Sequence, residues 1–401
     1  MIRTTLPNGL RVVVSHRPHA PVMALKLFMK VGSRHDGTRP GISHFVEHLM
    51  LGPQAAAEVE SLGGEINAVT HREYTALQAV APPQHASRLL GVFRDLVGPL
   101  ELAVDRVERE REVIAQEVEQ SADTHSAAWE LFVRALWGDD DPFARPIFGE
   151  SGTIRGVTAG ELAGHFSRYV VPERMVLAAA GPVEPDTLVE AAGRALGDLA
   201  GPRWEDGFGP VGAGPRRGRM IKETRVAHLI VGVDAVPIGD PRRPAVKVLD
   251  MLLGGGTASR LHQTLRARRG LVYDVSTAAM AFEDRGYLCA YTSCAPSNVG
   301  RVVEGLLEEF ERLAAEPAGE AELAGVRARY DGVLARRFET VLAAAGILGI
   351  EELLGHSESF EQAAAAVAQV DAEDARAAAA DLLKLDGVAV ALVGPPGTLD
   401  A

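Results

Sequence analysis

Residues 175–182 read MVLAAAGP, and residues 388–395 repeat this pattern of an apolar strand followed by Gly-Pro as VAVALVGP. The two stretches are 213 positions apart. A second pair agrees with them within one residue: Ala81-Pro82 and Ala295-Pro296 each precede a predicted helix, 214 positions apart. Self-similarity at a fixed spacing is typical of a duplicated unit. The sequence therefore predicts two homologous domains from an internal duplication.

Each predicted half begins with strands and continues with helices. Alternating apolar residues predict strands at 11–15 and 24–31 in the first half and at 226–235 in the second. Longer stretches with helical periodicity follow, and an apolar strand closes each half. This order of elements predicts an α+β fold in which each domain is a mostly antiparallel sheet packed against several helices.

The best candidate for a linker is the segment GPRWEDGFGPVGAGPRRG at 201–218. It is dense in glycine and proline and shows no apolar period. The predicted domains are residues 1–205 and 219–401, joined by a Gly/Pro-rich linker at 206–218. A chain of 401 residues is about the right length for two such domains.

Composition limits the classes of function. Hydrophobic residues make up 47% and charged residues 24%, which is typical of a soluble globular protein. A net charge of -13 argues against a nucleic-acid partner. We expect no membrane partner, because no apolar run reaches the about 20 residues of a bilayer span. The start MIRTTLPNGL lacks the pattern of a secretory signal, and Cys289 and Cys294 lie outside any metal or disulfide motif, so we expect a cytoplasmic protein with reduced cysteines.

The chemistry centres on the segment PGISHFVEHLML at 40–51, whose apolar spacing predicts a buried helix. His44 and His48 are one turn apart on one face, and Glu47 lies beside them. A catalytic zinc ion takes three protein ligands and keeps one position open. The best third donor is Glu117, on an acidic helix predicted at 104–120, where Glu110 lies seven residues away on the same face.

Each of these signals has an ordinary alternative. Two histidines on a helix can be core residues, and the acidic run around Glu110 and Glu117 is typical of a solvated helix face. Against the first alternative, burying two imidazoles and a carboxylate on an apolar face costs several kcal/mol unless they are paired or bind a metal. The residues alone therefore favour a metal at His44 and His48 and leave Glu117 open.

The sequence resembles the pitrilysin-type (M16) metallopeptidases, which include insulin-degrading enzyme and mitochondrial processing peptidase. The resemblance covers nearly the whole chain, in the short two-domain form of the processing peptidase subunits. It rests on these segments: LPNGLRVVV, HFVEH, GGEINAVTHREYT (63–75), EREREVIAQE (108–117), PFARPIFGESGTI (142–154) and LLGGGTASRLHQTLRARRGLVYDVS (252–276). HxxEH is the inverted zinc-peptidase motif.

The resemblance implies a role for each site residue and a zinc-dependent endopeptidase with one Zn²⁺ per chain. Its implied assignments are zinc ligands His44, His48 and Glu117, general base Glu47, auxiliary catalytic glutamate Glu110, substrate-backbone contacts Asn67 and Ala68, and an active-site pair Arg266 and Tyr273. Without the resemblance, Arg266 reads as a surface charge and Tyr273 as a strand-packing residue.

Partners and specificity follow less directly. Many family members have four domains, in one long chain or in two associated chains, so the two predicted here imply a dimer that closes around a peptide. The dimer is either a homodimer or a heterodimer with another M16-like chain. The stretch between His48 and the GG-x-x-NA segment is several residues shorter than is usual in the family. We therefore expect residues 51–56 to lack part of a loop that flanks the site, which leaves substrate preference open. The alternative function is a non-catalytic M16-like scaffold or a subunit of a heterodimeric processing peptidase.

Overall fold

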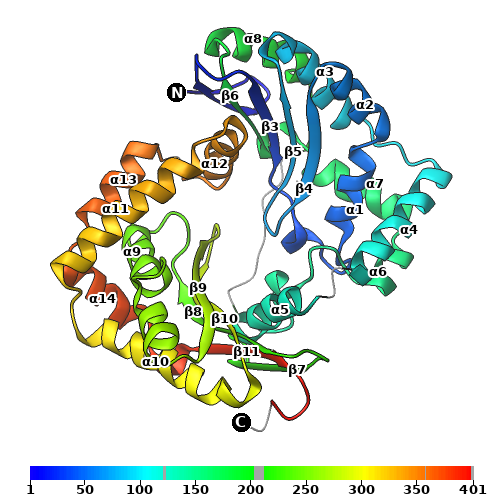
Figure 1. The fold of residues 1–401 in the computed structure, drawn as a ribbon. Coiled ribbons are helices and arrows are strands. Elements are labelled where there is room, and N and C mark those ends of the chain that lie inside the picture. The colour runs from blue at the N-terminus through cyan, green and yellow to red at the C-terminus, as the bar shows by residue number, and fades with distance from the viewer. Residues whose placement is uncertain (121–122, 203–211, 357, 399–401) are drawn as a thin grey trace. The chain divides into compact units, whose positions relative to one another are not determined.

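The computed structural model describes residues 1–120, 123–202, 212–356 and 358–398 (Figure 1). They form two compact units. Among the described residues, the first unit draws on residues 1–120, 145–202 and 337–356, and the second on residues 123–144, 212–336 and 358–398. Part of the predicted linker, residues 206–211, lies outside the described residues, and the division into domains 1–205 and 219–401 stays a prediction. None of the described helices is both long and apolar enough to span a bilayer.

The first unit is built on a six-stranded sheet. In spatial order its strands are β1 (Ile2–Thr5), β2 (Arg11–His16), β6 (Met175–Gly181), β3 (Met23–Met29), β5 (Thr75–Ala81) and β4 (Glu65–Thr70). Neighbouring strands are antiparallel except β2 and β6, which run parallel. Every residue of β6 is buried, which places this apolar strand at the centre of the unit.

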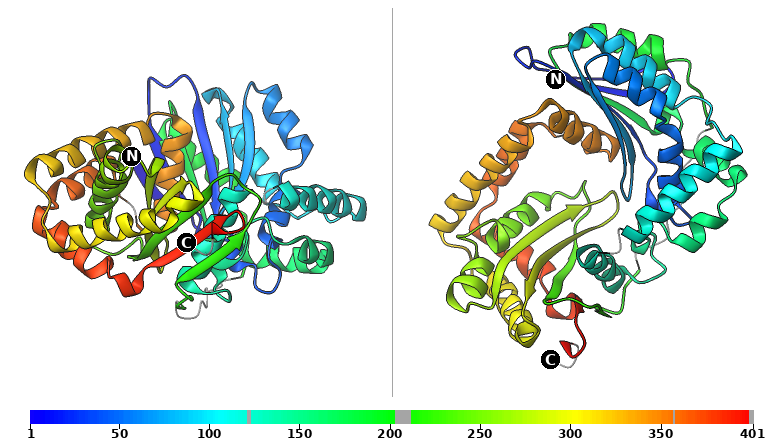
Figure 2. Two further views of the ribbon diagram at one scale, coloured as in Figure 1. Left: turned by 60° about the horizontal axis from the view of Figure 1, so that its bottom comes forward. Right: turned by 45° about the vertical axis from the view of Figure 1, so that its right-hand side comes forward.

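Helices cover both faces of this sheet (Figures 1 and 2). The helices and turns of the unit are α1 (Ile42–Met50), α2 (Pro53–Ser61), α3 (Ala86–Leu96), α4 (Val104–Gln120), α6 (Ser151–Gly156), α7 (Ala159–Tyr169), α8 (Pro185–Leu196), α12 (Val341–Leu353), η1 (Ser33–His35), η2 (Pro83–His85) and η4 (Pro172–Arg174). Side chains alternate along the strands: Val12 and Leu177 face the core formed with α1, α3, α7 and α8, and Val13 and Val176 face α12.

The second unit repeats this plan. Its strands in spatial order are β7 (Arg217–Ile221), β11 (Ala389–Gly394), β8 (Ala227–Ala235), β10 (Gly286–Cys294) and β9 (Val272–Ala281), with only β7 and β11 parallel. Its helices and turns are α5 (Thr124–Trp137), α9 (Arg243–Gly254), α10 (Val299–Ala315), α11 (Glu320–Arg337), α13 (Phe360–Gln369), α14 (Ala372–Leu382), η3 (Pro142–Ala144), the π-helical turn η5 (His262–Arg268), η6 (Pro296–Asn298) and η7 (Leu385–Gly387).

The predicted α+β duplication is confirmed by this topology. The order β2-β6-β3-β5-β4 corresponds to β7-β11-β8-β10-β9, and β1 is an addition to the first unit. Three pairs of elements, η2 and η6, α3 and α10, and α7 and α14, begin 213 positions apart. The structural equivalents are therefore Pro83 and Pro296, which corrects the spacing of 214 taken from the Ala-Pro pairs. Cys289 and Cys294 are free and buried in the second unit.

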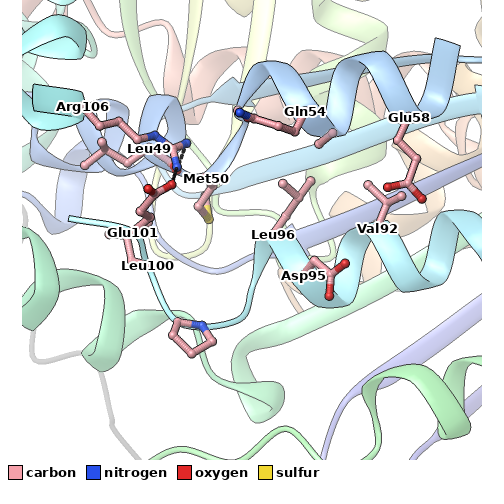
Figure 3. Close-up of a pocket in the computed structure, with 13 residues that line it drawn as sticks. Leu49, Met50, Gln54, Glu58, Val92, Asp95, Leu96, Leu100, Glu101 and Arg106 are labelled. Carbon is pink, nitrogen blue, oxygen red and sulfur yellow. Dashed lines mark hydrogen bonds and ion pairs between the residues drawn. The ribbon is translucent and has the colours of Figure 1, made fainter. Parts of the chain in front are cut away.

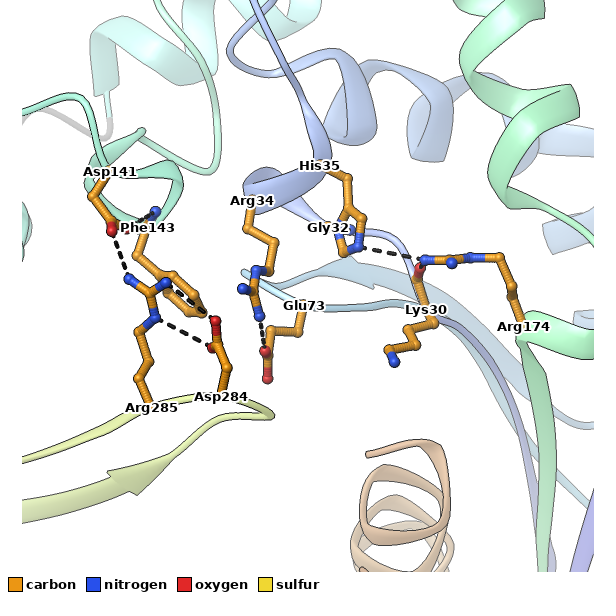
Figure 4. Close-up of polar contacts among 10 residues, drawn as sticks. All are labelled: Lys30, Gly32, Arg34, His35, Glu73, Asp141, Phe143, Arg174, Asp284 and Arg285. Atoms are coloured by element: carbon orange, nitrogen blue, oxygen red, sulfur yellow. Dashed lines mark hydrogen bonds and ion pairs between the residues drawn. The ribbon is translucent and has the colours of Figure 1, made fainter. Parts of the chain in front are cut away.

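Each unit takes one covering helix from the other half of the chain. Helix α12 follows α11 in sequence but packs on the sheet of the first unit, in a core with Phe28 and Ala178. Helix α5 follows α4 but packs on the sheet of the second unit, where Trp137 donates a 2.6 Å hydrogen bond to Asp234. Downstream of α5, Asp141 forms a buried ion pair of 2.6 Å with Arg285 of the same unit (Figure 4). The exchange is reciprocal.

Close packing of α12 depends on Gly349. A Cβ atom there would lie 2.2 Å from the Phe28 ring and 2.9 Å from the Ala178 side chain. We expect Gly349→Ala to destabilise the protein by about 1–3 kcal/mol through overpacking, although alanine favours a helix. Gly164→Ala in α7 is the matched control, because open space surrounds Gly164, and it should be neutral or stabilising. Chemical unfolding measures both variants, and equal stabilities would contradict this packing argument.

Candidate metal centre

Helix α1 of the first unit contains three residues of the predicted site, His44, Glu47 and His48. It begins after Gly41, whose φ of 91° suits glycine and whose missing side chain allows close contact with Gly149. Ile42, Phe45 and Leu49 are buried in the core. The opposite face presents His44 and His48, whose ring centroids are 4.7 Å apart with their planes at 84°. The predicted helix within residues 40–51 is confirmed, and it spans Ile42–Met50.

Helix α4 supplies two carboxylates to the same place. It spans the predicted residues 104–120 and is anchored through Arg111, which donates hydrogen bonds to the carbonyl oxygens of Ile154 and Val157 and lies over the Phe45 ring. With Arg111 buried in this way, the half-buried Glu110 and Glu117 turn toward α1. The spacing of seven residues therefore describes one face, as expected.

Three donor groups meet between α1 and α4. The Nε2 atoms of His44 and His48 lie 3.6 Å and 3.3 Å from Oε2 of Glu117, and the donor atoms of the three residues all lie within 4.8 Å of one another. A tetrahedral zinc ion with bonds of 2.0–2.2 Å holds its donors about 3.4 Å apart. Two imidazoles and a carboxylate at these separations fit such an ion.

His48 lies between the two carboxylates. Its Nδ1 atom is 3.2 Å from Oε2 of Glu110, and its Nε2 atom faces Glu117. If Nδ1 carries the hydrogen and donates it to Glu110, the Nε2 lone pair is free for a metal. Metal-binding histidines commonly donate their second nitrogen to a carboxylate in this way, which fixes the ring and its tautomer.

His44 is more deeply buried and carries no charge. Burial, and then the neighbouring His48, lower the pKa of His44 to about 3. Its contact with Glu117 is therefore no ion pair at neutral pH, although the distance alone would allow one. A neutral imidazole is the form that binds metal. The His44 and Phe148 rings also form a T-shaped contact, with centroids 5.0 Å apart.

Glu47 lies on the same face and is held by a hydroxyl. Thr70 of β4 donates a 2.7 Å hydrogen bond to Oε2 of Glu47. Burial raises the pKa of the Glu47 carboxyl, whereas the bond from Thr70 and the nearby His48 lower it and Glu117 raises it. A carboxylate with a raised pKa and a fixed orientation suits a general base.

Asn67 and Ala68 lie on β4, the strand at the edge of the six-stranded sheet. At the turn into β5, the N–H of His71 donates to the carbonyl oxygen of Tyr74. Hydrogen-bonded and non-hydrogen-bonded residue pairs alternate along two antiparallel strands. Ala68, three residues before His71, therefore belongs to a non-hydrogen-bonded pair, and its backbone N–H and C=O point away from β5. Consistent with this, the Ala68 N–H donates to the Asn67 side chain at 2.8 Å. The edge of β4 thus offers backbone groups near the candidate metal cluster of His44, His48 and Glu117.

Arg266 and Tyr273 lie together in the second unit. The Arg266 guanidinium is 5.1 Å from the centre of the Tyr273 ring and contacts Nε2 of His262 at 3.1 Å. Tyr273, on the edge strand β9, is 83% exposed. Without the family resemblance, Tyr273 would be taken for a strand-packing residue. Its exposure shows that this interpretation is wrong. His262 is buried and supports the arginine.

The structure thus brings His44, Glu47, His48, Glu110 and Glu117 together, and it pairs Arg266 with Tyr273. Sequence reasoning missed Thr70 and Phe148. The position of Thr70 could have been predicted. It lies two residues after the buried Ala68, on the same face of β4, and so faces α1. Phe148 follows no periodic element, and its contact with His44 arises from tertiary packing.

A separate pocket of about 290 Å³ lies at the C-terminal end of α1 (Figure 3). Leu49, Met50 and Leu96 form part of its apolar lining, and Arg106 at its rim donates to the Leu49 carbonyl oxygen at 2.7 Å. None of the predicted site residues lines it. This pocket is therefore distinct from the candidate metal cluster.

Comparison with known proteins agrees with the geometry. The model of the insulinase family, peptidase family M16, matches residues 11–151, and the model of the peptidase M16 inactive domain matches residues 156–330. An uncharacterized zinc protease of Mycobacterium bovis is 32% identical, in an alignment covering 99% of this chain and 93% of that protein. The chain belongs to peptidase family M16.

Other M16 relatives and solved structures extend this result. An uncharacterized zinc protease of Bacillus subtilis is 26% identical, with 99% of both chains aligned. A protease from Helicobacter pylori superposes on this M16 chain with a TM-score of 0.89 at 19% identity, over 98% of this chain and 99% of the other. A peptidase M16 inactive domain from Pseudomonas fluorescens gives 0.90 at 19% identity, over 98% and 97%. These structures agree in fold.

Proposed function

We propose that this M16 chain is a zinc-dependent endopeptidase that cleaves peptides or unfolded segments. The observation that carries the proposal is the arrangement of His44, His48 and Glu117, whose facing donor atoms are 3.3 Å and 3.6 Å apart where two helices meet. The names of the curated relatives, zinc proteases, support the choice of metal. We propose one Zn²⁺ per chain.

The remaining side chains then have defined tasks. His44, His48 and Glu117 would hold the zinc ion, which when bound would supply a Lewis acid that lowers the pKa of a water molecule and polarises a carbonyl group. Glu47 takes the proton from the attacking water and passes it to the leaving amine. Glu110 holds the His48 ring through Nδ1. Thr70 keeps the Glu47 carboxylate directed at the water.

Substrate binding is proposed along the edge of β4. An extended peptide that adds a strand there would pair with the backbone groups of Ala68. The Ala68 N–H would then donate to the peptide instead of to the Asn67 side chain. Such pairing recognises the backbone of the substrate more than its side chains. A broad sequence preference is the expected consequence.

Thr70→Val tests the orientation of the base. Loss of one hydrogen bond to a carboxylate corresponds to roughly a tenfold lower kcat. Zinc content should stay unchanged, because no zinc ligand is altered. Thr70→Ser is the matched control, since it keeps the hydroxyl and should retain most of the activity. Steady-state kinetics on a quenched fluorescent peptide distinguish them, and equal rates for Thr70→Val and wild type would rule out this role.

We also propose that Arg266 and Tyr273 contact the substrate, in a dimer that encloses the peptide. The resemblance to the family and the exposure of Tyr273 support this role. Mixing the inactive variants Glu47→Gln and Tyr273→Phe tests whether the pair acts across a dimer interface. Recovery of activity in the mixture would mean that one chain supplies the base and its partner the tyrosine. No recovery, with dimers present by light scattering, would place both in the same chain.

A non-catalytic scaffold, or a subunit of a heterodimeric processing peptidase, is the second candidate. The inactive-domain model that matches residues 156–330 favours it for that part of the chain, which contains none of the residues of the candidate metal cluster. One experiment separates the candidates: zinc analysis and a peptide-library cleavage profile on the same purified sample. Zinc with cleavage supports the peptidase, and zinc-free protein or a zinc-loaded protein without cleavage argues against it.

A further inference from the structure

Helix α1 begins without a cap from its own N-cap residue. Gly41 occupies that position and has no side chain to accept a hydrogen bond. The unpaired N–H groups at a helix start need acceptors. Asp36 supplies both of its oxygens from five residues upstream: Oδ2 accepts from the Gly41 N–H at 2.7 Å, and Oδ1 accepts from the Ser43 N–H at 3.2 Å.

The Ser43 side chain links this carboxylate to α7. Its hydroxyl lies 2.5 Å from Oδ1 of Asp36 and 2.9 Å from Nε2 of His165, with the Gly32 carbonyl oxygen at 3.1 Å. A serine hydroxyl has one hydrogen and accepts through its oxygen. When it donates to Asp36, it therefore accepts from His165, which must carry its hydrogen on Nε2.

Asp36 and Ser43 of this network are buried, and His165 is half-buried. Ser43 is 2% exposed and Asp36 is 4% exposed, and burial is the main cause that raises the pKa of Asp36 to about 7. Burial, then the nearby His35 and Arg168, lower the pKa of His165 to about 3, so this ring is neutral. The preceding turn η1 is itself fixed, because the buried Arg34 pairs with Glu73 at 2.5 Å (Figure 4).

We propose that Asp36, Ser43 and His165 are positioning residues that fix the rotation of α1 and thereby place His44 and His48 relative to Glu117. Ser43 immediately precedes His44, so any rotation at the network is passed to the ligands. Side chains end about 5–6 Å from a helix axis, and a rotation of about 10° moves them by about 1 Å. Zinc–ligand distances tolerate only about 0.2 Å. This inference rests on the proposed zinc site.

The test measures metal binding without substrate. Full-length wild type, Ser43→Ala and Asp36→Asn are titrated with zinc against a chromophoric chelator at pH 8, where Asp36 is ionised. We expect about 10- to 100-fold weaker zinc binding in both variants. We also expect a changed visible spectrum after Co²⁺ substitution, which reports the coordination geometry. Ser33→Ala is the matched control, because Ser33 is buried in η1 and its hydroxyl has no partner among the described residues.

The outcomes separate this inference from the proposed function. Wild-type zinc affinity and Co²⁺ spectrum in Ser43→Ala would overturn the positioning role, even if its melting temperature fell. The double variant Asp36→Asn/Ser43→Ala should lose no more affinity than the weaker-binding single variant, and fully additive losses would contradict a single network. Should wild type bind zinc and cleave no peptide, the peptidase proposal fails while the affinity measurements still decide the role of Asp36, Ser43 and His165.

Discussion

Replacing Glu47 with glutamine should leave zinc bound and lower kcat for peptide cleavage by about 10²- to 10⁴-fold, the contribution typical of a positioned acid–base group. Glutamine keeps the size of the side chain and an oxygen that accepts from Thr70. It cannot accept the proton of the attacking water. His44, His48 and Glu117 are untouched, so metal analysis should find the wild-type zinc content.

Glu112→Gln is the matched control for this variant. Glu112 lies on the exposed side of α4, away from the face that carries Glu110 and Glu117. Its replacement should change neither kcat nor zinc content. Wild-type turnover by Glu47→Gln would refute the assignment of the base, and loss of zinc from that variant would show that Glu47 acts on the metal instead.

The second large effect is expected for His48→Ala. His48 contacts both Glu110 and Glu117, so its removal deletes one donor and breaks the contact that orients the cluster. Zinc should be lost on dialysis and cleavage should become undetectable. Since a ligand that binds only the folded state stabilises it, wild type should melt at a higher temperature with zinc than after chelation, and His48→Ala should not.

His19→Ala controls for the loss of any histidine. His19 is exposed in the same unit and should retain both zinc and activity. Element analysis after dialysis, together with melting curves with and without a chelator, measures all three proteins. If His48→Ala kept one zinc per chain, the proposed ligand set would be wrong.

Much of the site follows from the sequence because helical spacing is rigid. His44, Glu47 and His48 share a face in any α-helix, and the expected helix at 104–120 forms with those bounds. Glu117 was ambiguous because α4 carries many acids, most of which are solvated. The seven-residue spacing from Glu110 does not distinguish this pair, because Glu112 and Glu119 have the same spacing. Only the packing of α4 against α1 shows which face turns inward.

The reciprocal exchange of α5 and α12 was beyond sequence reasoning. Periodicity shows which side of a helix is buried and not which sheet it covers. In α12, the small residues Ala344, Ala345 and Gly349 fit against β3 and β6, but they would suit many close contacts. Asp36 was missed for a similar reason, because a cap five residues before the N-cap position matches no standard helix-start signal.

The covering of the first sheet by α12 also sets an order of events during synthesis. Strand β6 completes that sheet at Gly181, and about 160 further residues must be translated before α12 begins at Val341. At about 5–20 residues per second, this interval is on the order of ten seconds or longer. Until then Val13, Phe28 and Val176 have no covering helix on the nascent chain. A ribosome-associated chaperone is therefore expected to engage this half of the chain more than the other, since α5 is already made when the strands it covers emerge.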